Sequence, residues 1–325
     1  MLDILKMIIY KLPIINGYRK NMNDLVTDVK SLELETLKNL KSSKSANTLR
    51  AYKADFRDFA LFCQQNGLIS IPSEPKIITL YITHLSKTSK FSTLKRRLAS
   101  ISVIHKLNGH YLDTKHPIIT ENLLGIKRVK GTYQRAKKPI LINDLKLIIN
   151  AINQDKNSKS KSENKALLLV GFAGGFRRSE LVSIEYEDLE FVSEGVKIFV
   201  RRSKTDQSGE GMTKAIPYFG NSEYCPVVSI QKWLEESKVK SGKIFEMSDK
   251  NVALIIKKYT ALAGLDHKKY SGHSLRSGFA TSTAEFGAEE RSIMAMTGHK
   301  TTQMVRRYIK EANLFNNNAL NKIKI

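Results

Sequence analysis

The sequence has little of what marks a secreted, membrane-spanning or metal-binding protein. Its 325 residues include two cysteines, Cys63 and Cys225, too few for a disulfide framework or, by themselves, for a zinc site. The main apolar run, from Ala166 to Phe176, is far shorter than the ~20 residues that cross a bilayer. The first residues carry scattered lysines and lack a small-residue cleavage site, so we expect no secretory signal. The sequence therefore predicts a cytoplasmic protein with no membrane partner.

Several motifs that would indicate a cofactor are also missing. The sequence has no Walker A pattern for a nucleotide, and no Asp-Asp-Glu cluster suited to two Mg²⁺ ions. It has no Cys/His spacing typical of zinc. We therefore expect no metal and no cofactor.

Acidic residues are scarce relative to basic ones. The chain has 54 Lys and Arg against 31 Asp and Glu, a formal net charge of +23. Residues 41–135 carry 17 basic and 5 acidic side chains, net +12, whereas residues 1–40 carry 6 and 5, net +1. A surplus of this size favours a polyanionic partner, with nucleic acid as the first candidate. A lysine-rich solvated surface is the alternative.

Residues 41–130 show helical periodicity and no strand signal, which predicts a small helical domain. The first strong helix would begin at Asn47 or Thr48 as N-cap and end at Gly67. Further helices are expected within 73–88, 89–109 and 121–139, the last fading into a basic linker over 131–139. Residues 1–40 would form an N-terminal extension.

Residues 140–325 predict a second domain that mixes helices with a few strands. A helix capped by Asn143 opens it, and a largely apolar helix follows that breaks at Gly174–Gly175 and resumes at Ser179. Three strand-like runs cover 183–192, 196–205 and 213–219, and the last two flank a loop rich in turn residues. The fold class is therefore mainly α with a small antiparallel β-sheet (α+β).

Four segments of this second domain carry groups that bind or activate phosphates. They hold Arg177 with Glu180, Lys204 at the tip of the expected hairpin, His273 with Arg276, and His299 with Tyr308 nine residues later. Each segment alone is weak, because a surface cation, a core histidine or a packing aromatic would give the same letters. The information lies in the set, its order and its spacings.

Residues 140–312 closely resemble the tyrosine recombinases of the phage integrase family. The family pattern is matched by Gly175-Phe176-Arg177 with Glu180, by a hairpin lysine, by His273-x-x-Arg276, and by Gly298-His299 followed by Tyr308. The helical domain, which opens with Asn47-Thr48 and Tyr52, resembles the SAM-like core-binding domain of the family more loosely. The resemblance implies a recombinase that integrates, excises or resolves a mobile element through a 3′-phosphotyrosyl intermediate.

The chemistry of these residue types agrees with that reading. Arg177 and Arg276 can clamp the nonbridging oxygens of a phosphodiester with charge-assisted hydrogen bonds. Tyr308 would be the nucleophile with His273 as its base, because a phenol of pKa near 10 needs deprotonation. Lys204 would protonate the leaving oxygen, His299 would donate a hydrogen bond to the phosphate, and Glu180 would orient a neighbour. Two alternatives stay open: a type IB topoisomerase, and a non-catalytic DNA-binding protein with the same fold.

Double-stranded DNA is the expected partner, and by resemblance the protein would form a homotetramer synapsed on two DNA sites. An accessory factor that sets the direction of the reaction is a further partner that the resemblance allows. The apolar residues of the tail after Glu311 would pack on a neighbouring subunit or on their own domain. The leading candidates for contacts to the DNA backbone are Lys95, Arg96, Arg97, Lys127, Arg128 and Lys130.

Overall fold

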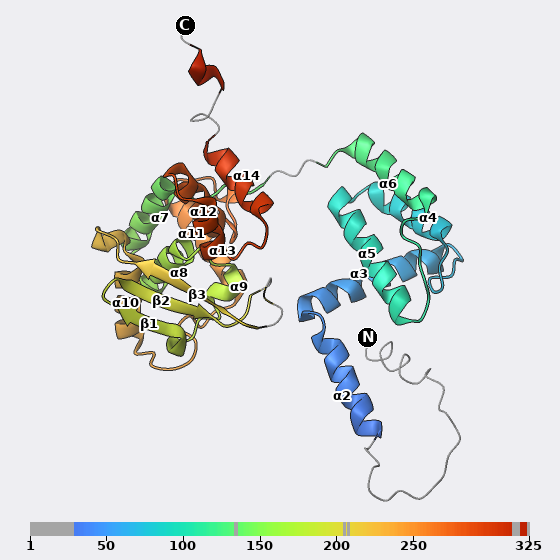
Figure 1. Ribbon diagram of the computed structural model, residues 1–325, viewed down its shortest axis with the longest axis horizontal. Helices are drawn as coiled ribbons and strands as arrows, with labels where there is room; N and C mark the ends of the chain where they lie inside the picture. Colours follow the sequence, from blue (N-terminus) through green and yellow to red (C-terminus); the bar gives the residue numbers. More distant parts are fainter. Residues whose placement is uncertain (1–28, 133–135, 204–205, 207–208, 314–318, 324–325) are drawn as a thin grey trace, which may run out of the picture. The chain divides into compact units, whose positions relative to one another are not determined.

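The structure is a computed structural model, and it describes residues 29–132, 136–203, 206, 209–313 and 319–323. The chain divides into two compact units, Met1–Gln134 and Arg135–Ile325 (Figure 1). The division falls inside the stretch that the sequence suggests as a linker, 131–139. Each unit is considered by itself below. No helix of the described residues is long and apolar enough to cross a membrane.

The first unit is helical throughout its described residues. Its elements are α2 (Val29–Ser42), α3 (Ala46–Gln65), α4 (Pro75–Ser86), α5 (Phe91–Leu107) and α6 (Pro117–Lys130). The N-cap of α3 is Ser45, whose hydroxyl accepts from the Thr48 amide, and not Asn47 or Thr48 as the sequence suggested. Ser45 lies one residue before the first helical position and supplies the acceptor that exposed amides require. The helix α2 crosses the boundary suggested at residue 40.

One hydrophobic core holds α3 to α6 together. The rings of Phe59 and Tyr81 meet edge to face with centroids 5.1 Å apart, and the aliphatic side chains of Ile82, Leu94 and Ile101 are fully buried beside them. These residues recur at helical spacing on α3, α4 and α5, so each helix turns one apolar stripe inward.

The second unit is mostly helical and includes one small sheet. Its elements are α7 (Ile142–Gln154), α8 (Lys161–Ala173), α9 (Arg178–Leu181), β1 (Leu189–Val192), β2 (Gly195–Val200), β3 (Met212–Pro217), α10 (Pro226–Ser237), α11 (Asp249–Leu262), α12 (Ser274–Glu285), α13 (Glu290–Thr297) and α14 (Thr302–Ala312). The strands form an antiparallel sheet in the order β1-β2-β3. The mainly α fold with a small antiparallel sheet is confirmed. Asn143 lies inside the first turn of α7, since Leu141 occupies the cap position.

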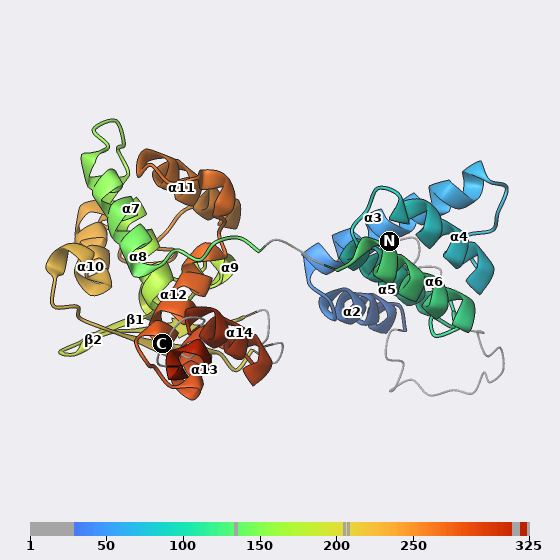
Figure 2. The same cartoon turned by 90° about the horizontal axis from the view of Figure 1, so that it is seen from above.

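Helix α8 is the axis of this unit. It is buried over its last two turns, and α7, α10 and α12 pack around it (Figure 2). A second, smaller cluster of Ala280, Ala284, Ile293 and Val305 joins α12, α13 and α14 at one end. The candidate site forms where α8 ends, α12 begins and α14 passes.

Candidate active site and nucleic-acid interface

The turn between α8 and α9 positions Arg177. Gly175 has φ +54°, and a Cβ on it would lie 2.9 Å from Cδ1 of Phe279, so glycine fits this left-handed, crowded position. Arg177 follows as the N-cap of α9. The carboxylate of Glu180 accepts from the Arg177 amide at 2.9 Å and from its guanidinium at 2.5 Å. Glu180 is 3% exposed, so this buried carboxylate holds the guanidinium of Arg177 in one orientation from the interior side.

Arg276 approaches the same turn from α12. Its side chain is 1% exposed; Nη1 donates to the Gly175 carbonyl at 2.8 Å and Nη2 to Nε2 of His299 at 3.1 Å. Burial and the charge of Arg177 lower the pKa of Arg276 to about 10, which still leaves it protonated at neutral pH. The structure thus brings both arginines of the sequence prediction to one turn.

His299 is held as a neutral ring. A guanidinium only donates, so Nε2 accepts the Arg276 hydrogen bond and the ring proton lies on Nδ1, 2.7 Å from the Thr297 hydroxyl. Burial, together with the charges of Arg276 and Arg177, lowers the pKa of His299 to about 4. In this state His299 orients Arg276. Donation from His299 to a phosphate, as the sequence suggested, needs a proton on Nε2 and stays a prediction.

His273 and Tyr308 face each other across the site. His273 precedes α12, Tyr308 is on α14, and Nε2 lies 3.2 Å from the phenol oxygen. Partial burial of the imidazole, followed by the charges of Arg276 and Arg177, lowers the pKa of His273, so the ring is neutral at pH 7 and able to accept a proton. Burial raises the pKa of Tyr308, although Arg276 and Arg307 oppose this shift. The phenol therefore needs a base, and the imidazole is within reach of its proton.

Lys204 lies outside the described residues. The structure instead reveals a lysine that the sequence reasoning missed, Lys214 on β3. It is 1% exposed and donates to the Gly174 carbonyl at 2.7 Å. The signal was in the strand alternation, because Lys214 is two residues before the buried Ile216 and so shares its face.

Metal ligands do not gather in this unit or elsewhere in the described ranges. Within them no group of three or more His, Cys, Asp or Glu side chains could hold a metal ion. Among the described residues, the positive charge at the site comes from the arginines, with Lys214 beside them.

In the helical unit, two of the expected DNA-binding residues have internal partners. Arg96 and Arg97 both pair with Asp55, which is 2% exposed, and Arg97 also contacts Asp58 at 2.8 Å. The Ser100 hydroxyl completes the cluster by donating to Asp55 at 2.7 Å. These two arginines hold α5 to α3.

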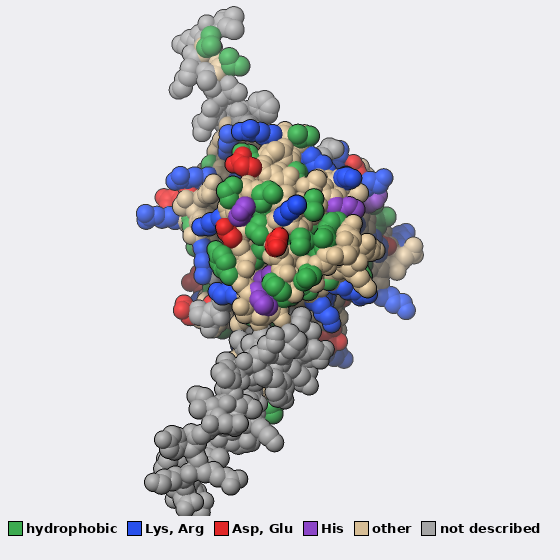
Figure 3. Space-filling model, turned by 90° about the vertical axis from the view of Figure 1, so that its right-hand side faces the viewer, with side chains coloured by type: hydrophobic (Ala, Val, Ile, Leu, Met, Phe, Trp, Pro, Cys, Tyr) green, Lys and Arg blue, Asp and Glu red, His purple; other side chains and the backbone are tan. Residues whose placement is uncertain are grey.

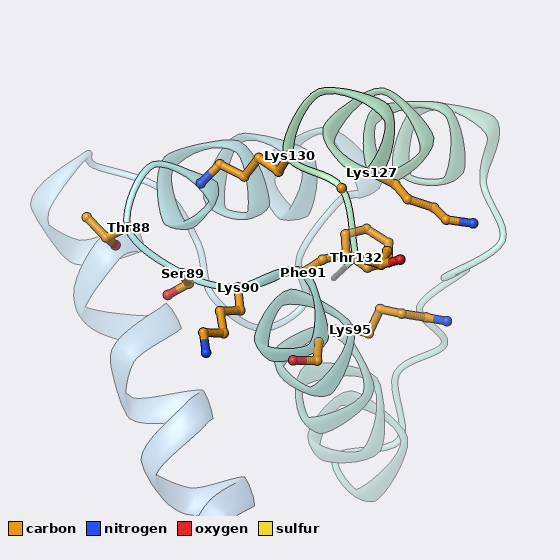
Figure 4. Close-up of a pocket in the computed structure, with 10 residues that line it drawn as sticks. Thr88, Ser89, Lys90, Phe91, Lys95, Lys127, Lys130 and Thr132 are labelled. Atoms are coloured by element: carbon orange, nitrogen blue, oxygen red, sulfur yellow. The ribbon is translucent and has the colours of Figure 1, made fainter. Parts of the chain in front are cut away.

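The other expected lysines are free for a ligand. Lys95, Lys127 and Lys130 line one hollow of about 610 Å³ together with Lys90, which the sequence analysis did not select. Their ammonium groups stand around its rim (Figure 4). All four are exposed, and none forms an ion pair within the described ranges. Arg128 is exposed but does not line this hollow.

The basic side chains do not cover the helical unit evenly. The face in Figure 3 carries hydrophobic side chains with basic and acidic ones scattered among them, and no basic patch. In the hollow between α6 and the start of α5, by contrast, four lysines gather and no acidic side chain lines it.

Comparison with known sequences identifies relatives of the second unit and of the whole chain. Residues 140–314 match the phage integrase family. The chain is 42% identical over 316 residues to an integrase/recombinase XerD homolog of Selenomonas ruminantium, covering 93% of this chain and 92% of that protein.

Solved structures share the fold at low sequence identity. The XerH site-specific recombinase bound to a palindromic difH substrate matches with a TM-score of 0.65 and 15% identity, covering 97% of this chain and 95% of that one. A lambda integrase dimer bound to a COC′ core site matches with a TM-score of 0.57 and 16% identity, covering 89% and 77%. Chains of known structure thus share the fold over most of the length of this chain.

Proposed function

The chain belongs to the phage integrase family of tyrosine recombinases, enzymes that cleave and rejoin DNA strands, and from that premise we propose that it acts through a covalent 3′-phosphotyrosine. The Tyr308 oxygen attacks the scissile phosphorus, the bond to the 5′ oxygen breaks, and that oxygen leaves with a proton. The 5′ hydroxyl of a second strand then attacks the phosphotyrosine and releases Tyr308. One ester replaces another at each step, so the scheme consumes no nucleotide.

The observation that carries this proposal is the pairing of Tyr308 with His273 beside two anchored arginines. The phenol proton has a neutral acceptor at 3.2 Å. Arg177 and Arg276 are held by Glu180, Gly175 and His299 before any substrate arrives, and such preorganised donors stabilise the charge that develops on the phosphate. The proton of the leaving oxygen is assigned to Lys204, as the resemblance implies.

The partner that we propose is double-stranded DNA, with the lysines around the hollow of the helical unit as contacts to its backbone. Exposed, unpaired ammonium groups neutralise phosphates without reading bases. We further propose that four copies assemble on two DNA sites in the cytoplasm to move or resolve a mobile element. Two features support such an assembly. The second unit has an apolar hollow of about 710 Å³ lined by Phe172, Phe219 and Phe286, and Leu320 and Ile323 of the tail are exposed. These tail side chains would pack into the hollow of a neighbouring copy.

A nicked suicide substrate tests the chemistry. On such DNA the fragment carrying the 5′ hydroxyl diffuses away, so the wild type should accumulate a protein–DNA adduct on a denaturing gel. Tyr308→Phe should bind the same DNA and form no adduct, because only the attacking oxygen is lost. Excess EDTA should leave the yield unchanged. An adduct with the Phe variant, or a strict Mg²⁺ requirement, would remove Tyr308 from the mechanism.

A second duplex distinguishes recombination from relaxation of supercoils. A recombinase should transfer the covalently held strand to a partner site of the same sequence, whereas a topoisomerase reseals the strand that it cut. The assay is strand exchange between two labelled duplexes of different length.

A further inference from the structure

Lys214 is a buried charged group that the proposed mechanism does not use. Its ammonium donates to the Gly174 carbonyl and lies 4.3 Å from the centroid of the Phe176 ring. Burying an ammonium is unfavourable unless hydrogen bonds and opposite charge offset the lost hydration. A strand position next to Ile216 would normally hold an aliphatic side chain. The lysine therefore needs an explanation beyond packing.

The carbonyls that Lys214 and Arg276 contact are consecutive. Lys214 binds the oxygen of Gly174, and Arg276 binds the oxygen of Gly175 at 2.8 Å. Arg177 follows two residues later as the cap of α9. One turn thus receives a cation from β3 and another from α12, and it leads directly into the second arginine.

We propose that Lys214 is a positioning residue, which ties β3 to the Gly174–Gly175 turn and so holds Arg177 and Arg276 where the phosphate binds. It does not touch the reacting atoms, because its side chain is 1% exposed and its ammonium is engaged by a backbone carbonyl. This assignment rests on the proposed phosphotyrosyl reaction, since that reaction supplies the assay.

The ammonium of Lys214 gains or loses its proton near neutral pH, where the reaction can be assayed. The groups that face it are Glu180 and Arg177 from α9 and its cap, Arg276 from α12, and His299 from the turn after α13. Burial first, and the two arginines next, lower the pKa of Lys214 to about 7, while Glu180 opposes them. Above that pH the ammonium loses its proton, its hydrogen bond to Gly174 weakens, and the arginines lose part of their support.

The test compares Lys214→Met with Lys214→Arg and with a control, Lys197→Met on β2, whose ammonium pairs with Glu190 in a more exposed position. We expect Lys214→Met to slow adduct formation at least tenfold with DNA affinity little changed. Lys214→Arg should recover most of this loss, because it keeps a donor and a charge. Lys197→Met should behave as the wild type.

The pH profile separates positioning from a purely structural role. At limiting DNA the rate reports the free enzyme, so the wild-type rate should fall above about pH 7, whereas Lys214→Met should lack that falling limb. The free energy of unfolding should depend on pH in the opposite direction.

The pKa of Lys214 is lower in the folded chain than in the unfolded chain, so the unfolded chain holds the proton more tightly. The cost of burying the charged ammonium is therefore full below pH 7 and fades as the pH rises toward 10.5. Lys214→Met should therefore unfold no more easily than the wild type at pH 7.

A DNA substrate with sulfur in place of the leaving 5′ oxygen identifies a general acid. A thiolate leaves without protonation, so this substrate should not rescue Lys214→Met; rescue would make Lys214 the proton donor and overturn the proposal. A Met variant with an unchanged rate, or with a pH profile parallel to the wild type, would equally overturn it. If the Met variant does not fold, a Lys214→Arg profile that still falls above pH 7 decides against it. Failure of the wild type to form any adduct would instead reject the proposed function.

Discussion

The two units of the chain use positive charge in opposite ways. In the second unit Arg177 and Arg276 are tied to Glu180, Gly175 and His299, so their positions are set before a ligand binds. In the helical unit the lysines of the hollow are exposed and have no ion-pair partner among the described residues. A tethered cation can stabilise a transition state at a defined point, whereas a free one neutralises a phosphate wherever the backbone passes.

The same contrast occurs between neighbours in the helical unit. Lys95 lines the hollow, while the next two residues, Arg96 and Arg97, turn inward to Asp55. Basic residues that are adjacent in the sequence thus divide between binding and structure. Net charge alone overstates the number of residues available to DNA.

Removing an arginine of the second unit should have the largest effect. Arg276→Ala and Arg177→Ala should each slow adduct formation by about 10²-fold or more, as expected for the loss of one preorganised donor. DNA affinity should fall much less, because many phosphate contacts remain. Single-turnover cleavage together with a binding titration measures both. A rate loss below tenfold for both variants would show that holding the two arginines in place before the substrate binds does not speed cleavage.

Removing an arginine of the helical unit should affect stability. Arg97→Ala leaves the buried Asp55 with fewer partners and should lower the free energy of unfolding by about 2–3 kcal/mol. Lys95→Ala should change it by less than about 0.5 kcal/mol. Urea unfolding of both variants provides the comparison, and equal midpoints would contradict it.

The free lysines should be visible in the salt dependence. Replacing Lys95, Lys127 and Lys130 with Gln should reduce the slope of log affinity against log salt by about two to three. Target and random DNA should weaken alike, because phosphates carry no sequence information. A variant that loses the same charge at Lys232, Lys240 and Lys257 is the control. An unchanged slope would show that the hollow is a solvated surface and not a DNA contact.

Two buried histidines provide the finest test of the comparison. His299 has a pKa of about 4, below its ordinary value near 6.5. The unfolded chain therefore binds the proton first, and stability should fall by about 2–3 kcal/mol as pH drops from 6.5 to 4. Burial also lowers the pKa of His105, whose Nε2 accepts from the Ser73 amide. Replacing either with Gln should reduce acid sensitivity, but only His299→Gln should slow cleavage, since only His299 contacts Arg276.

Sequence patterns of helical periodicity, glycine breaks and strand alternation predicted most of the helices and strands. The break at Gly174–Gly175 and a strand overlapping each of the three runs follow from glycine conformation and alternation, although the first run is a strand only over Leu189–Val192 and forms a 3-10 turn over Tyr186–Asp188. The caps Asn47 and Asn143 were wrong because several polar residues compete near each helix start, and tertiary packing decides which one is used. The strand alternation around Lys214 also carried a usable signal.

Long-range pairing was not readable from the sequence. Asp55 and Arg96 are 41 residues apart, and nothing local distinguishes Arg96 from Lys95. The order and spacing of Arg177, His273, Arg276, His299 and Tyr308 could be read, yet not that Arg276 donates to His299 and so selects its tautomer. Such facts depend on which helices meet, and the turn that joins the two arginines exists only in the folded unit.

The small cluster that holds α14 has a mechanical consequence. Tyr308 is anchored through Val305, Ile293 and two alanines of α12, whereas the arginine turn belongs to the large core around α8. Detaching α14 therefore exposes little apolar surface and needs a small fraction of the free energy that unfolds the unit. Tyr308 and the two arginines thus belong to parts of the unit that differ in stability. Local opening of α14 should therefore separate Tyr308 from Arg177 and Arg276 well before the rest of the unit unfolds.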